Sequence, residues 1–145
     1  MPDEAALATI DAAVEAILPS VEGRAGASEL GVATHVAEAI ELYLPGFVVL
    51  LVTLLDAYAR DVRPDAVFTD LTPDERRHVI REMSKEESPE MQDIVDGLLV
   101  FTYGGFYSEW TGYARESRTL DPPAVWTDMG YQGPSLGVPG YREGI

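Results

Sequence analysis

The sequence predicts an all-α fold, a compact bundle of about five helices followed by an extended C-terminal strap. Two observations predict it. In residues 1–110, apolar residues recur at spacings of three and four, and proline, glycine or capping residues separate these runs. Residues 111–145 lack a helical or alternating period and are rich in glycine, proline and aromatic residues. We therefore expect a single domain with a helical part, 1–110, and a tail, 111–145.

The first two helices are predicted at residues 3–18 and 28–43. Pro19 ends the first helix, and Ser28 is a suitable N-cap for the second. Each helix has one apolar face, formed by Leu7, Ile10, Val14 and Ile17 in the first and by Leu30, Val36, Ile40 and Leu44 in the second.

A third helix is predicted at residues 47–60, directly after the break at Pro45-Gly46. Its first part, Phe47 to Leu55, is apolar nearly all round, which is typical of a central, buried helix. This run is too short to span a bilayer, so we expect no direct insertion into a membrane.

The fourth and fifth helices have the clearest start signals. Thr72 is followed by Pro73 and, three residues after the cap, by Glu75, which is the pattern of a capping box. Ser88-Pro89 begins the fifth helix, whose apolar residues follow the helical spacing. We expect Gly104-Gly105 to be either a break in this helix or a point of close packing.

The tail contains the stretch WTDMGYQGPSLGVPGY, residues 126–141, whose glycines and prolines argue against both helix and strand. Fully extended, it would reach about 50 Å, which is longer than a five-helix domain is wide. It could cover its own third helix or reach a partner chain, and composition leaves these alternatives nearly even. The candidate partner contacts are Tyr107, Trp110, Trp126, Met129, Gly130, Tyr131, Gly133, Pro134, Gly140 and Tyr141.

The composition excludes several function classes. The chain has 145 residues, is 46% hydrophobic and carries a formal net charge of −15. This acidity argues against binding to nucleic acid or to an anionic membrane surface, since both require a basic patch. The chain has no cysteine, so disulfides, thiolate metal sites and cysteine nucleophiles are excluded within it.

The search for catalytic residues finds one weak candidate. Glu75 and His78 form a Glu-x-x-His pair, the spacing used in di-iron carboxylate bundles. Such a site needs a second pair and two more carboxylates, whereas His35 and Glu38 stand in the reverse order. Nucleophile-elbow, phosphate-loop and dinucleotide motifs are absent. We expect no catalytic, cofactor or metal site in this chain; an independent helical enzyme or metal-binding bundle using Glu75 and His78 is the alternative.

Three segments, in order along the chain, resemble the gluconate 2-dehydrogenase subunit 3 family. IDAAVEAILPSVEGRAGASELGV is similar to the family's opening helix, its closing proline and the turns that follow. FTDLTPDERRHVIREM is similar to its mid-chain Phe-x-x-Leu and capped helix. WTDMGYQGP is similar to its C-terminal Trp and Gly-Tyr-x-Gly-Pro, with a further Gly-Tyr at Gly140-Tyr141. Gln132 departs from the pattern, since proline is usual there.

The resemblance implies an accessory role. Members carry no flavin and pair with a large FAD-dependent subunit of the glucose–methanol–choline oxidoreductase type, which oxidises a sugar or alcohol, and often with a cytochrome subunit. Many members have a twin-arginine leader for export, and the sequence shows no such leader. The expected location is therefore the cytoplasm, or the periplasm if a leader has been removed.

Overall fold

The computed structural model describes residues 2–108, 113–114 and 116–131. This part of the chain is mostly helical, which confirms the all-α prediction. Its α-helices are α1 (Glu4–Ile17), α2 (Val32–Tyr43), α3 (Phe47–Val62), α4 (Pro73–Ser84), α5 (Pro89–Tyr107) and α6 (Ala124–Met129). A 3₁₀ turn, η1 (Phe68–Asp70), precedes α4, and two short antiparallel strands, β1 (Tyr113–Ala114) and β2 (Thr119–Leu120), precede α6.

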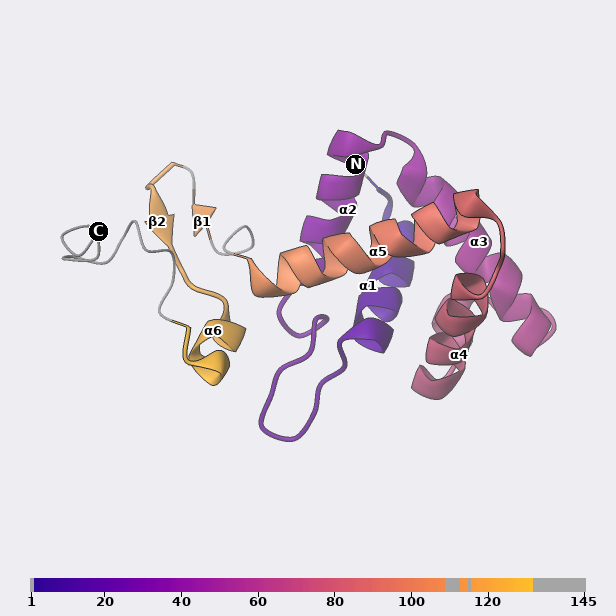
Figure 1. The fold of residues 1–145 in the computed structure, drawn as a ribbon, viewed down its shortest axis with the longest axis horizontal. Coiled ribbons are helices and arrows are strands. Elements are labelled where there is room, and N and C mark those ends of the chain that lie inside the picture. Colours follow the sequence, from indigo (N-terminus) through magenta and orange to yellow (C-terminus); the bar gives the residue numbers. More distant parts are fainter. Residues whose placement is uncertain (1, 109–112, 115, 132–145) are drawn as a thin grey trace.

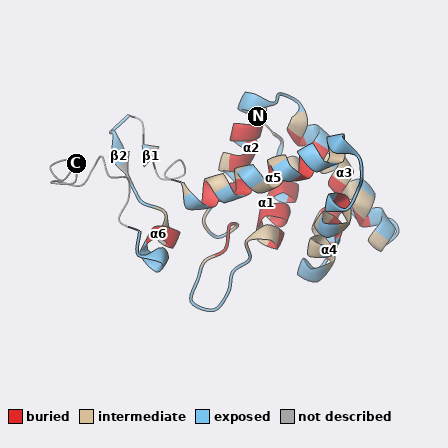
Figure 2. Ribbon diagram, viewed as in Figure 1, coloured by how far each residue is buried: buried red, intermediate tan, exposed pale blue. Residues whose placement is uncertain are grey.

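The core lies between the first five helices. Figure 1 shows α5 lying across the bundle, where it packs against α2, α1 and α4. The buried residues form one cluster, to which every helix and η1 contribute, and Figure 2 shows them along the inner faces of the helices. The largest fully buried side chains include Ile10, Ile40, Leu51, Phe68 and Leu98.

Local signals place three helix starts correctly. The side chains of Asp3, Thr72 and Ser88 each accept a hydrogen bond from a backbone N–H in the first turn of α1, α4 and α5. The capping box predicted for α4 is confirmed, because Glu75 also accepts from the backbone N–H of Thr72, at 2.8 Å. These bonds satisfy amide groups that have no partner within the helix.

The predicted start of the second helix is wrong by three residues, because the N-cap is Gly31 and not Ser28. α2 begins at Val32, after Gly31 in a left-handed conformation (φ 68°). Ser28 instead holds the preceding loop against α1: its hydroxyl donates to Asp11, at 2.7 Å, and its backbone N–H donates to Glu15, at 3.2 Å. The hydroxyl that suggested an N-cap is thus used in a tertiary contact.

Gly26, within the family-like opening segment, is required by close packing of the same loop. A Cβ built there would lie 2.3 Å from the backbone nitrogen of Ser20 and 2.8 Å from Oε2 of Glu15. Glu15 in turn accepts from the N–H of Ser20, at 2.9 Å. A side chain at position 26 would therefore push the loop away from α1.

α3 is less enclosed than its composition predicts. Val48, Leu51, Leu55 and Ala59 face the core, but Val49, on the other side, is 68% exposed. The helix therefore buries one face in this chain rather than its whole circumference.

α5 runs without interruption through Gly104-Gly105, so the break expected there is wrong. The other expectation, close packing, holds for Gly105: a Cβ there would lie 3.0 Å from Cγ1 of Val32 and 3.0 Å from Cδ2 of His35. A Cβ at Gly104 would meet nothing within 4 Å. One glycine thus lets α5 approach α2, while its neighbour faces open space.

Candidate partner-binding surface

The C-terminal region contains regular secondary structure that was not predicted from the sequence. Residues 124–129 form α6, which ends at Gly130 in a left-handed conformation (φ 69°). The glycines and prolines of the stretch 126–141 lie after its first turn and so do not prevent the helix. Pro123 before the helix and Gly130 after it follow the usual asymmetry of helix ends, and this signal could have revealed α6.

Trp126 holds α6 against the end of α5. The indole is buried, and its N–H donates to the backbone carbonyl of Tyr107, at 2.6 Å. The ring of Tyr131 packs edge-to-face on it, with ring centroids 4.9 Å apart. Within the chain the Trp126 side chain packs on α5 rather than on the Phe47–Leu55 segment, and its expected contact with a partner stays a prediction.

The other candidate contacts fall into two groups. The side chains of Tyr107, Met129 and Tyr131 are exposed, at 39%, 64% and 49%, and Gly130 forms the turn between the last two. Trp110, Gly133, Pro134, Gly140 and Tyr141 lie outside the residues that the structure describes.

A line of exposed side chains on α5 was not predicted from the sequence, except for its last member, Tyr107. Asp93, Asp96, Val100, Tyr103 and Tyr107 follow one another at spacings of 3, 4, 3 and 4, and all are exposed; we call this line the α5 stripe. Its last three members are apolar or aromatic, and the Tyr103 and Tyr107 rings stack with centroids 6.2 Å apart. The signal was present in the sequence, because α5 has apolar residues on more than one face.

A second exposed apolar group lies at the end of α2. Leu42, Tyr43 and Leu44 are 74%, 64% and 45% exposed. Tyr43 stacks on Phe101 of α5, with ring centroids 6.3 Å apart, so this group adjoins α5. Apolar groups at this density on an exposed surface are typical of a protein–protein contact.

Charge is distributed unevenly over the bundle. The sequence has no lysine or arginine between Arg24 and Arg60, nor between Lys85 and Arg115. The side chains that carry a full charge on α2 and α5 are therefore all carboxylates. In the described ranges, the ion pairs that lysine and arginine form fall between Arg63 and Lys85. The acidity of α2 and α5 is therefore not balanced by basic residues on those helices.

Glu75 and His78 have different interaction partners in the structure. Oε2 of Glu75 accepts from the N–H of Thr72, at 2.8 Å, and from Arg63, at 2.7 Å, and these two bonds lower the pKa of its carboxyl group. The carboxylate that pairs with His78 is that of Glu82 and not that of Glu75, with 4.0 Å between Nδ1 of His78 and Oε1 of Glu82. His78 lines a cavity of about 520 Å³ with Tyr58 and several carboxylates, but within residues 2–108, 113–114 and 116–131 no three potential ligands are placed to hold a metal ion.

Comparison with known proteins assigns the family. The family model described as gluconate 2-dehydrogenase subunit 3 matches residues 4–133, which include the six α-helices of the described part of the chain. The chain belongs to this family. No curated protein and no solved structure matches the chain.

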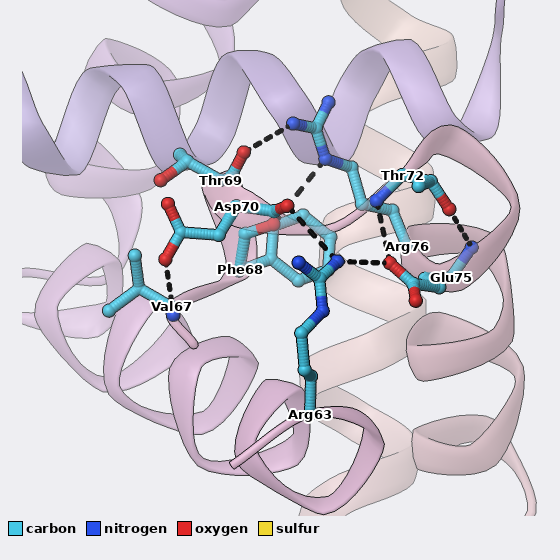
Figure 3. A network of polar contacts seen from close by, with 8 residues as sticks. All are labelled: Arg63, Val67, Phe68, Thr69, Asp70, Thr72, Glu75 and Arg76. Atoms are coloured by element: carbon cyan, nitrogen blue, oxygen red, sulfur yellow. Dashed lines mark hydrogen bonds and ion pairs between the residues drawn. The ribbon is translucent and has the colours of Figure 1, made fainter. Parts of the chain in front are cut away.

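Membership of the gluconate 2-dehydrogenase subunit 3 family suggests that the chain is a small subunit of a dehydrogenase complex. Its family-like mid-chain segment has a structural task, shown in Figure 3. Arg76 donates to the backbone carbonyl of Thr69, at 2.6 Å, and Arg63 donates to that of Asp70, at 3.3 Å. These bonds hold η1 so that the Phe68 ring is fully buried. The side chains of this mid-chain segment therefore stabilise the bundle, and the outer surface of the bundle is left for other contacts.

None of the helices that the structure describes is both long enough and apolar enough to cross a lipid bilayer.

Proposed function

We propose that this chain is a non-catalytic accessory subunit that binds and stabilises a large FAD-dependent dehydrogenase subunit of the glucose–methanol–choline type. The observation that carries the proposal is the family match over residues 4–133. In this proposal the flavin and the oxidation of a sugar or alcohol belong to the large subunit. Electrons then pass to an acceptor outside this chain, such as a cytochrome subunit.

The exposed side chains support a binding role. Val100, Tyr103 and Tyr107 on α5 and Leu42 and Tyr43 on α2 present apolar area to solvent. Covering such area stabilises a complex, because each Å² of apolar surface removed from water contributes about 25 cal/mol. Glu75, on which a catalytic role would depend, already caps α4 and binds Arg63.

Co-expression tests the proposal. The chain, tagged at its N-terminus, is produced with the flavoprotein encoded beside it, and the eluate is examined for a second protein with the absorption spectrum of FAD. We expect a complex of the two proteins that oxidises a sugar or alcohol. We also expect the flavoprotein to be recovered in lower soluble yield when this chain is omitted.

Two results would contradict the proposal. One is a flavoprotein that is soluble and active alone and does not co-purify with this chain. The other is a dehydrogenase activity of the isolated chain.

A further inference from the structure

The α5 stripe combines two different chemistries along one line. Toward the start of the helix it presents Asp93 and Asp96, and toward the end it presents Val100, Tyr103 and Tyr107. The opposite face of α5, with Ile94, Val95, Leu98, Thr102 and Phe106, is buried in the bundle. Alternating spacings of three and four residues keep the stripe along one side of the helix, as in helix-packing seams.

Local helix energetics do not account for this pattern. Carboxylates stabilise the first turn of a helix, where Glu90 lies and accepts from Ser88, but Asp93 and Asp96 lie beyond that turn. Val100 is 67% exposed, a high value for a β-branched apolar side chain in a helix, and its hydration gives the isolated chain no benefit. The pattern has an explanation if another surface covers the stripe.

Electrostatics indicate the chemistry of that surface. α2 and α5 contain no lysine or arginine, and in the described residues the ion pairs that lysine and arginine form fall in the Arg63–Lys85 region. A partner must therefore supply the positive charges opposite Asp93 and Asp96. Complementary charge at the rim of an interface steers association and suppresses incorrect partners.

A second copy of the chain does not fit these requirements. Two α5 stripes side by side in parallel would place carboxylates against carboxylates. In antiparallel order, the carboxylates of one copy would meet the apolar end of the other. The net charge of −15 adds a general repulsion between copies.

We propose that the flavoprotein subunit covers the α5 stripe, with apolar side chains opposite Val100, Tyr103 and Tyr107 and with lysine or arginine opposite Asp93 and Asp96. This inference rests on the proposed function. It adds which face of α5 the flavoprotein binds, which end of the stripe meets its basic side chains, and which end meets its apolar side chains. Tyr107 connects the stripe to the C-terminal region, because its backbone carbonyl holds Trp126.

The experiment compares two valines of nearly equal exposure in the co-expressed complex. Val100→Asp changes the stripe, and Val49→Asp changes a residue that is 68% exposed in a groove between α1 and α3. We expect Val100→Asp to weaken binding of the flavoprotein at least about thirtyfold, since it places a charge in a desolvated contact. Val49→Asp should change the affinity by less than about threefold. Circular dichroism checks that both variants keep the helical content of the wild type.

A charge-reversal pair tests the direction of binding without changing apolar area. Asp96→Lys lies on the stripe, and Asp61→Lys, on the exposed end of α3, changes the net charge equally. We expect Asp96→Lys to slow association on the order of tenfold at low salt, and this effect to shrink as salt screens the charges. Asp61→Lys should leave the association rate within about twofold.

The outcomes separate this inference from the proposed function. If the flavoprotein does not co-purify with the unmodified chain, both fail. If it co-purifies and Val100→Asp binds as tightly as the wild type, the stripe is not the interface, although the chain is still a subunit. If Val49→Asp alone disrupts the complex, the groove between α1 and α3 is the interface. A homodimer of the isolated chain that Val100→Asp dissociates, with flavoprotein binding unchanged, would assign the stripe to a second copy and overturn the inference.

Discussion

The two adjacent glycines of α5 allow a sharp test of how closely α5 packs on α2. In Gly104→Ala the new methyl group meets nothing within 4 Å, whereas in Gly105→Ala it lies 3.0 Å from Cγ1 of Val32 and from Cδ2 of His35. Both substitutions gain the same local term, because alanine is favoured over glycine within a helix by about 1 kcal/mol. Only in Gly105→Ala is this gain opposed by steric repulsion between the new methyl group and α2.

The magnitude of that steric term follows from the rigidity of the neighbours. Val32 is 1% exposed and β-branched, so its side chain has little freedom to move away. Overpacking of a core by one methyl group costs about 1–3 kcal/mol. We therefore expect Gly104→Ala to raise the free energy of unfolding by about 0.5–1 kcal/mol, and Gly105→Ala to lower it by up to about 2 kcal/mol.

Urea unfolding of the two variants and the wild type, followed by far-ultraviolet circular dichroism, measures both values. The midpoints should move in opposite directions at an unchanged slope, because the surface exposed on unfolding is nearly the same. Equal stabilisation by the two substitutions would refute the reasoning, since it would mean that α2 moves away from α5 at little cost.

Three further predictions concern single side chains. Trp126→Ala should destabilise the chain by about 3 kcal/mol in urea unfolding, because Trp126 is buried. Trp126→Phe keeps an aromatic ring but loses the bond to the Tyr107 carbonyl and part of the buried indole, so it should cost less, about 1–2 kcal/mol. A loss below about 0.5 kcal/mol for Trp126→Ala would show that α6 does not pack on α5 in solution. Burial lowers the pKa of His35, although Glu38 opposes this, so the folded state binds fewer protons than the unfolded state; stability should fall as pH decreases below the unfolded value of about 6.5, and His35→Gln should remove that component of a pH series, whereas an unchanged pH dependence would contradict the assignment. His78→Ala should change stability by no more than about 0.5 kcal/mol and leave the activity of the complex intact; loss of activity at normal complex yield would restore a catalytic reading of this residue.

The sequence by itself determined the features that depend on neighbouring residues. Helix spacing, the stop at Pro19 and the Thr72–Glu75 capping box are local, because the groups that interact lie within one turn of each other. The three segments that resemble the family were also readable directly. They indicated the family that the match over residues 4–133 then showed.

Only the tertiary structure decided the features that depend on distant residues. Ser28 could cap a helix or bind Asp11, and Gly105 could break α5 or bring it close to α2; in each case the choice is made by an element elsewhere in the chain. For Trp126, a candidate partner contact, the structure shows a bond within the chain to the Tyr107 carbonyl, and its contact with a partner stays a prediction. The same holds for the α5 stripe, because composition shows apolar residues all round a helix, and only packing decides which of them are left facing water.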